Sequence, residues 1–109
     1  MIYDDRKERE LLYLKALAMF GVKGQLGKAV EELCEASAAI TRFLTRPEGH
    51  TAGGIRDSLF EELADASIMV EQLELMFADQ TDTLGRSLSQ IRERKLRRLE
   101  KLMHGTENA

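Results

Sequence analysis

The chain contains few of the residues that would mark a secreted, membrane-bound or aromatic-rich protein. Its 109 residues include one cysteine (Cys34), one proline (Pro47), two tyrosines, four phenylalanines and no tryptophan. A single cysteine excludes an internal disulfide framework and fits a reducing compartment, so we expect a cytoplasmic protein. The sequence begins "MIYDDRKERE", which is charged where the apolar part of a signal peptide would lie. No apolar run approaches membrane-spanning length, so we expect no membrane partner.

A strong excess of charge of one sign is also absent. The formal net charge is only −3, with 19 acidic and 16 basic residues. There is therefore no overall basic field to attract nucleic acid, and we expect no nucleic-acid partner. The length predicts a single domain over 1–109 with a modest core, whose stability would benefit from association with a second copy.

The pattern of apolar residues is helical. One proline and eight glycines leave long uninterrupted stretches, which favours an all-α protein. We predict a short-looped four-helix bundle with helices over 4–20, 24–45, 57–78 and 82–103. Gly21 ends the first helix, Arg46–Pro47 stops the second, and Asp82 or Thr83 caps the fourth. The segment 46–55, "RPEGHTAGGI", has the composition of a loop and is a candidate lid.

Two nearly identical acidic strings recur thirty residues apart: "EELCEAS" at 31–37 and "EELADAS" at 61–67. Advancing each residue by about 100° around a helix axis places Glu32 and Glu62 inside the apolar arcs of their helices. The other acids divide into two sets: Glu35 and Asp65 lie at the arc edges, and Glu31 and Glu61 point away. The two strings therefore present the same acidic pattern on two helices.

Carboxylates inside an apolar arc lose hydration, and several of them together repel one another. Protonation or a divalent cation would compensate. Residues at i and i+3 share a helix face, so two facing helices would bring both acidic pairs together, as in carboxylate metal sites of helix bundles. Oxygen ligands without histidine or cysteine favour Mg²⁺, or Mn²⁺ in its place. We predict a metal site formed by Glu32, Glu35, Glu62 and Asp65; the ordinary alternative is a solvated acidic face.

A basic segment accompanies the acids. In "TLGRSLSQIRERKLRRLEKLM", Lys95 lies in the middle of the apolar face and Arg98 lies beside it. These cations would contact a phosphate chain or neutralise the acids, with plain surface salt bridges as the alternative. Lys28, one turn before Glu32, is a weaker candidate for substrate binding. Gln25 is either a polar contact to substrate or an exposed residue at a helix start.

Three segments carry a resemblance to a known family: "QLGKAVEELCEAS", "EELADASIMVEQLELMF" and "IRERKLRRLEKLM". Together they resemble the MazG-like members of the all-α nucleoside triphosphate pyrophosphatase superfamily. The ExxE and ExxD signature of that family corresponds here to Glu32-Leu-Cys-Glu35 and Glu62-Leu-Ala-Asp65. The resemblance covers about 21–103 and implies a MazG-like four-helix bundle.

The resemblance also implies a function. It implies Mg²⁺-dependent hydrolysis of a nucleoside triphosphate or deoxynucleoside triphosphate to the monophosphate and pyrophosphate, in nucleotide-pool cleansing or nucleotide metabolism. The four acids of the signature would hold the metal, Glu31 or Glu35 would help to activate the attacking water, and Lys95 and Arg98 would contact phosphate. Family members assemble as homodimers or homotetramers with the site near subunit contacts. The alternative is a non-enzymatic or regulatory helical interaction module of the same fold with a structural cation.

Overall fold

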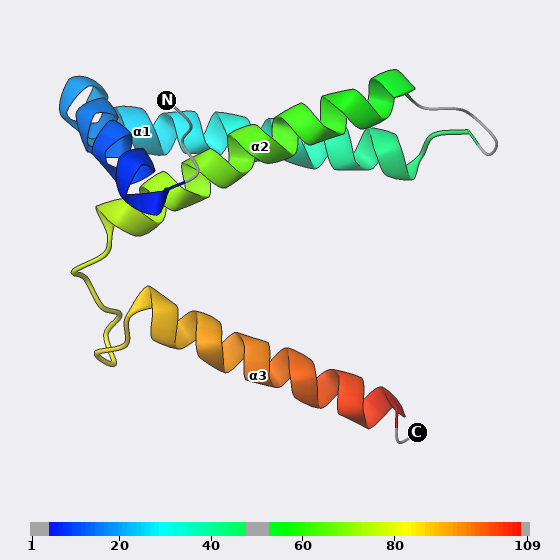
Figure 1. Cartoon of the computed structure of the whole chain (residues 1–109). Helices are drawn as coiled ribbons and strands as arrows, with labels where there is room; N and C mark the ends of the chain where they lie inside the picture. Colours follow the sequence, from blue (N-terminus) through cyan, green and yellow to red (C-terminus); the bar gives the residue numbers. More distant parts are fainter. Residues whose placement is uncertain (1–4, 48–52, 108–109) are drawn as a thin grey trace. The chain divides into compact units, whose positions relative to one another are not determined.

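The computed structural model describes residues 5–47 and 53–107, and within these ranges the regular structure is entirely helical. It contains three helices: α1 (Arg6–Leu44), α2 (Gly53–Met76) and α3 (Leu88–Glu107) (Figure 1). The all-α prediction is therefore confirmed for the described residues. The first two predicted helices correspond to the two segments of α1, which are joined at Gly21, so three helices stand where four were predicted.

A bend divides α1 at Gly21, where the backbone leaves helical geometry with φ 76° and ψ 166°. This region of φ and ψ is accessible almost only to glycine, because a Cβ atom would clash with the backbone. The predicted break at Gly21 is thus confirmed as a kink, and helical structure resumes immediately after it rather than at Gly24. Asp5 caps the start of α1, since its side chain accepts a hydrogen bond from the Lys7 backbone N–H at 2.9 Å.

Helices α1 and α2 pack against each other as an antiparallel hairpin (Figure 1). Small side chains let the two backbones approach closely, so the buried apolar residues are mostly alanines: Tyr13, Ala29, Ala36, Ala39, Ala66 and Met69. The buried Gln25 side chain donates a hydrogen bond of 2.7 Å to Gln72 on α2, which sets the register between the two helices.

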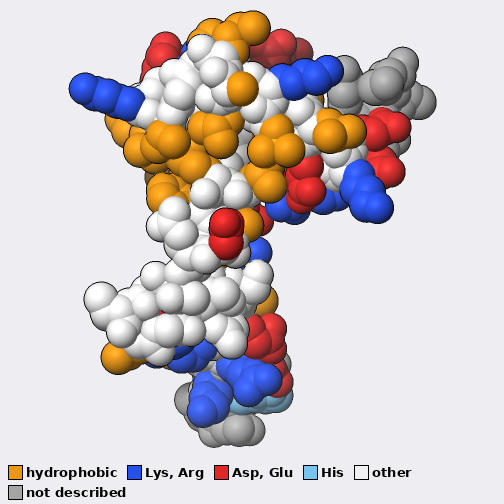
Figure 2. Space-filling view, turned by 90° about the vertical axis from the view of Figure 1, so that its left-hand side faces the viewer, with side chains coloured by type: hydrophobic (Ala, Val, Ile, Leu, Met, Phe, Trp, Pro, Cys, Tyr) orange, Lys and Arg blue, Asp and Glu red, His pale blue; other side chains and the backbone are white. Residues whose placement is uncertain are grey.

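Many large apolar side chains in this hairpin are exposed, including Leu33 and Leu63. Figure 2 shows hydrophobic side chains gathered over the part of the chain that contains α1 and α2. The hairpin by itself therefore buries only part of its apolar surface.

Helix α2 begins at Gly53, four residues before the predicted start at Asp57. The predicted loop 46–55 is consequently shorter at its C-terminal end, because Gly53 to Ile55 are helical. Residues 48–52 lie outside the described part of the chain, so the proposed lid stays a prediction.

The chain divides into two compact units, Met1–Met76 and Phe77–Ala109. The second unit begins with a turn held by Asp82, whose side chain accepts hydrogen bonds from the backbone N–H groups of Leu84 and Arg86, both at 3.0 Å. The Arg86 guanidinium donates a further bond of 2.8 Å to Asp82, and these bonds lower the pKa of Asp82, the guanidinium contributing most. Gly85 completes the turn with φ 76°.

The predicted start of the last helix at Asp82 or Thr83 was wrong, because α3 begins at Leu88. Ser87 caps it: the Gln90 backbone N–H donates to the Ser87 hydroxyl at 3.2 Å, and the Ser87 backbone N–H donates to the Gln90 side chain at 2.8 Å. This reciprocal pair is a capping box. Asp82 instead accepts hydrogen bonds from backbone N–H groups of the preceding turn. None of the helices in the described ranges combines the length and apolarity that crossing a bilayer requires.

Candidate metal centre

Three carboxylates meet where α1 passes α2. Glu32 and Glu35 on α1 and Glu62 on α2 each offer an oxygen, and these three oxygens lie within 4.8 Å of one another. The two acidic strings are therefore brought together by the antiparallel hairpin, from opposite helices. Such spacing is compatible with three oxygens sharing one divalent cation.

Burial distinguishes this cluster from a solvated acidic face. The Glu32 residue is only 8% exposed, Glu62 is half-buried, and Glu35 is exposed. One oxygen of Glu32 and one of Glu62, both Oε2, are buried without any hydrogen-bond partner. A buried acceptor without a partner loses its interaction with water and receives nothing in return, which costs about 1–3 kcal/mol. The cluster thus contains two oxygens that a bound cation would satisfy.

Lys28 supplies part of the compensation. Its Nζ lies 2.9 Å from Glu32 Oε1 and 3.7 Å from Glu31 Oε2. The hydrogen bond to Glu32 is the largest cause of a raised pKa at Lys28. Lys28 is half-exposed and engages only one of the two Glu32 oxygens, so the buried Oε2 stays without a partner.

Mutual repulsion is visible at Glu35. The nearby charge of Glu32 is the first cause that raises the pKa of Glu35, followed by desolvation, the charge of Glu62 and the charge of Glu31. A hydrogen bond between Glu35 and Glu62 also favours the protonated form of Glu35. The neighbouring acids therefore make the charged form of Glu35 less favourable, and a divalent cation bound at these oxygens would offset this repulsion.

The remaining acids of the two strings lie around this centre. Asp65, the fourth predicted ligand, is exposed and is not one of the three converging carboxylates. The register set by the bond between Gln25 and Gln72 brings position 65 of α2 level with Glu32 of α1. Glu31 is exposed beside Lys28, as predicted from its angular position.

Gln25 is not the exposed helix-start residue that one sequence interpretation allowed. It is buried within α1, and its amide group is bonded to Gln72. Its visible role is to join α1 to α2 about two turns before Glu32. Contact between Gln25 and a substrate stays a prediction.

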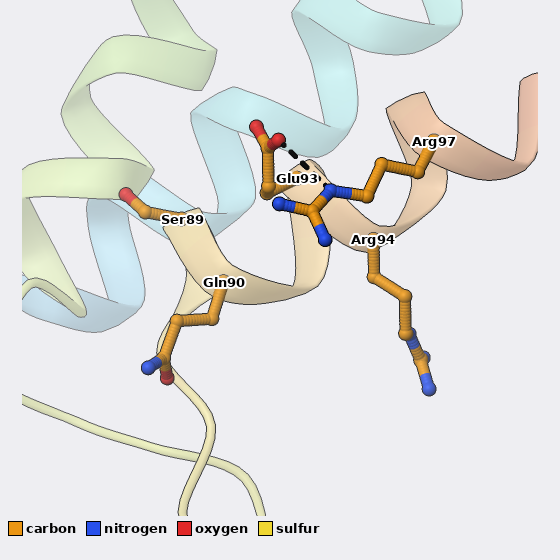
Figure 3. A pocket seen from close by; sticks show the side chains of 5 residues that line it. All are labelled: Ser89, Gln90, Glu93, Arg94 and Arg97. Atoms are coloured by element: carbon orange, nitrogen blue, oxygen red, sulfur yellow. Dashed lines mark hydrogen bonds and ion pairs between the residues drawn. The ribbon is translucent and has the colours of Figure 1, made fainter. Parts of the chain in front are cut away.

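Lys95 and Arg98 belong to α3 in the second unit, and both are exposed. Lys95 lies in a shallow apolar groove along α3, lined by Leu88, Ile91, Arg92, Lys95, Leu96 and Leu99. On the polar side of the same helix, a hollow of about 350 Å³ is lined by Ser89, Gln90, Glu93, Arg94 and Arg97, with an ion pair of 3.3 Å between Glu93 and Arg97 (Figure 3). Both hollows are lined by residues of α3 alone, so neither encloses a ligand. Contact of Lys95 and Arg98 with phosphate stays a prediction.

The chain matches no family model, no curated protein and no solved structure. The resemblance to MazG-like proteins therefore rests on the sequence motifs alone. The converging carboxylates and their buried oxygens are independent of that resemblance.

A second polar cluster, which sequence reasoning missed, joins the start of α1 to the end of α2. We call it the N-terminal clasp; it comprises Arg6, Arg9, Tyr13, Glu71 and Glu74. The Arg9 guanidinium donates to both oxygens of Glu71 at 2.8 and 2.9 Å, and the Tyr13 hydroxyl donates at 2.6 Å. These bonds, Arg9 first, lower the pKa of Glu71, and burial is the main cause that raises the pKa of Tyr13 to about 12.

Arg6 extends the N-terminal clasp, with nitrogen–oxygen distances of 3.5 Å to Glu71 and 3.4 Å to Glu74. The clasp holds the segment before the Gly21 kink against the same helix that carries Glu62. The period of the first segment, which places Arg6, Arg9 and Tyr13 on one face, is the sequence signal that could have indicated it.

Proposed function

We propose that this chain is a Mg²⁺-dependent nucleoside triphosphate pyrophosphohydrolase of the MazG-like type. The observation that carries the proposal is the pair of buried carboxylate oxygens, Glu32 Oε2 and Glu62 Oε2, which have no partner in a cluster of three converging acids. An all-oxygen donor set without histidine or cysteine fits Mg²⁺ or Mn²⁺. The acidic motifs that supply these oxygens are the same motifs that carry the family resemblance.

In this proposal the chain's own residues divide the work between holding a cation and positioning water. Glu32, Glu35 and Glu62 hold the cation, and Asp65 is the expected fourth ligand on α2. When bound, the cation neutralises phosphate oxygens and the charge that develops as the pyrophosphate leaves. Glu35 is the proposed base that accepts a proton from water, because it is the exposed member of the three converging acids. Glu31 is the alternative base.

Basic side chains have two supporting roles in the proposal. Lys28 contacts one oxygen of Glu32 at 2.9 Å, which leaves the buried second oxygen of Glu32 available to the cation. Lys95 and Arg98 are proposed to contact the triphosphate, which requires α3 to lie near the acids during turnover. Positioning and charge neutralisation contribute most to phosphoryl chemistry of this kind, so few other groups are required.

The direct experiment is a panel of canonical and modified nucleoside and deoxynucleoside triphosphates, assayed for pyrophosphate release with Mg²⁺ and with Mn²⁺. We expect turnover of at least one substrate, which chelation abolishes. Glu62→Gln should remove this turnover, because it deletes one of the converging charges. Glu61→Gln is the matched control, since it makes the same chemical change at an exposed neighbour on the same helix.

Two outcomes would contradict the proposal. Turnover that persists after thorough chelation would exclude the metal-dependent mechanism. A chain that binds Mg²⁺ at the cluster but releases no pyrophosphate from any substrate would support the structural-cation alternative instead.

A further inference from the structure

Lys28 and Glu32 form an ion pair whose two members differ in burial. The two residues lie one turn apart on the same face of α1, and Lys28 Nζ is 2.9 Å from Glu32 Oε1. The Lys28 side chain is 51% exposed, whereas that of Glu32 is only 11% exposed. A lysine ammonium is a compact charge on a flexible stem, so it can exchange one acceptor for another without any change in the backbone. The contact therefore joins a carboxylate held inside the hairpin to a cation that can leave it.

The metal centre uses the same carboxylate. Glu32 is the most buried of the three converging acids, and its Oε2 has no partner. Both oxygens of a carboxylate are bonded to one carbon atom, so a divalent cation held by Oε2 would lie within a few ångströms of an ammonium on Oε1. Charges of like sign repel in inverse proportion to their separation, and the double charge of the cation doubles this repulsion. A divalent cation in the cluster therefore opposes the contact between Lys28 and Glu32.

A second acceptor lies beside Lys28. The Lys28 Nζ is 3.7 Å from Glu31 Oε2, and the Glu31 side chain is 58% exposed. An ion pair between two exposed side chains contributes little free energy, because water screens both charges. After release from Glu32, Lys28 would thus be held only weakly next to the cluster. An anion bound to the divalent cation could then take the place of the Glu32 carboxylate as its partner.

We propose that Lys28 is a phosphate ligand that becomes available when the metal centre is filled. Without a divalent cation it pairs with Glu32, and with the cation bound it contacts a phosphate group of the substrate. The phosphate contact rests on the proposed function, whereas the release from Glu32 depends only on the charges in the cluster. This exchange makes the two ligands cooperative, because binding of the cation frees the lysine that the phosphate then uses. Each ligand should raise the affinity for the other by the same factor.

A fixed supporting role for Lys28 predicts the opposite effect on metal binding. If the 2.9 Å contact served to hold Glu32 in place for the cation, loss of the ammonium would weaken metal binding. If the ammonium instead opposes the cation, its loss would strengthen metal binding. The sign of the change therefore distinguishes the two roles without any measurement of catalysis.

The test measures Mn²⁺ binding to the full chain in phosphate-free buffer, with free Mn²⁺ quantified by electron paramagnetic resonance. Lys28→Met keeps an apolar stem and removes the charge, so it should tighten Mn²⁺ binding by about tenfold or more. Lys28→Arg keeps the charge and should bind Mn²⁺ within about threefold of wild type. Lys23→Met is the matched control, since it makes the same change at an exposed lysine of α1 that lies farther from Glu32. It should change the dissociation constant by about twofold at most.

A second measurement tests the phosphate contact. The preformed complex of Mg²⁺ with inorganic triphosphate is titrated into Mg²⁺-saturated chain and followed by calorimetry. The dissociation constant should be about tenfold or more higher for Lys28→Met than for wild type. The two effects of this substitution then have opposite signs, with tighter cation binding and weaker triphosphate binding. A general loss of folding would weaken both.

Three results would overturn the inference. They are unchanged or weaker Mn²⁺ binding in Lys28→Met, equal effects of Lys28→Met and Lys23→Met, and triphosphate binding that Lys28→Met leaves unchanged. Failure of the proposed function has a different signature. A wild-type chain that shows both expected binding effects but releases no pyrophosphate from any nucleotide would support the inference about Lys28 and contradict the enzymatic activity. A wild-type chain that binds no Mn²⁺ would overturn both.

Discussion

Replacing Glu32 with glutamine removes one charge from the metal centre and leaves the side-chain volume almost unchanged. In the wild-type chain without metal, the buried Oε2 of Glu32 has no partner, which costs about 1–3 kcal/mol. A glutamine amide can instead donate hydrogen bonds to the neighbouring carboxylates of Glu35 and Glu62. We therefore expect Glu32→Gln to raise the free energy of unfolding in chelator by about 1–3 kcal/mol, a gain that the lost contact with half-exposed Lys28 reduces only slightly.

Divalent cations should reverse the order of stability, so that the wild-type chain becomes more stable than Glu32→Gln. A ligand at 100 times its dissociation constant stabilises the folded state by about 2.7 kcal/mol. Wild-type protein should gain this stability from Mg²⁺, whereas Glu32→Gln, with one ligand charge removed, should gain much less. Thermal unfolding followed by circular dichroism, first in chelator and then in excess Mg²⁺, measures both effects.

The pH dependence provides a further check on the same cluster. Because the charge of Glu32 raises the pKa of Glu35, the Glu35 contribution favours folding at pH values below the usual glutamate range, and is lost as pH rises through the raised pKa. In chelator, the stability difference between Glu32→Gln and wild type should therefore shrink on acidification through this window.

Two results would refute the reasoning about Glu32. One is a Glu32→Gln variant that is no more stable than wild type in chelator. The other is a Glu32→Gln variant that gains as much stability from Mg²⁺ as wild type does. Glu61→Gln serves as the control and should shift the free energy of unfolding by less than about 0.5 kcal/mol under both conditions.

Three further predictions concern the scaffold. Glu71→Gln should lower the free energy of unfolding by about 1–3 kcal/mol at neutral pH. Urea titrations should show that the stability difference between the variant and wild type shrinks as pH falls through the lowered Glu71 pKa. An undiminished difference in acid would count against the N-terminal clasp. Gly21→Ala should destabilise by about 1–3 kcal/mol at its positive φ, whereas Gly27→Ala, in open helical space, should not. Ser87→Ala should cost α3 about 1 kcal/mol and lower amide protection in its first turn, an effect that Ser89→Ala should lack.

The sequence predicted the pattern of acids in the metal centre because that pattern depends on one helical parameter. A step of 100° per residue separates Glu32 from Glu31 around the same helix, and the structure accordingly buries Glu32 and exposes Glu31. The predicted break at Gly21 is confirmed for a similarly local reason, because glycine readily adopts the positive φ found there. Asp82 shows where local reasoning failed: it is a good capping residue, but it completes a turn, and Ser87 with Gln90 starts the helix.

The apolar arcs show a different limit of sequence reasoning. Leu33 and Ala36 lie three residues apart on one apolar side of the helix, so periodicity alone does not distinguish them. In the hairpin, Ala36 is buried against α2 while Leu33 is exposed, because the small side chain permits close contact and the larger one does not fit between the backbones. Which side chains of an apolar arc become buried depends on the helix that packs against them. The sequence of a single helix does not specify that packing.

The sequence by itself determined the helical class, the kink at Gly21 and the direction in which each acid leaves its helix, since all three follow from the allowed angles and the period of a single chain segment. Only the tertiary structure decided that Glu62 meets Glu32 and Glu35, that Arg9 and Tyr13 hold Glu71, and that two of the buried carboxylate oxygens lack a partner. Those facts depend on the antiparallel register of α1 against α2. This register brings residues that are far apart in the chain into contact, so that their charges and hydrogen-bonding groups interact away from water.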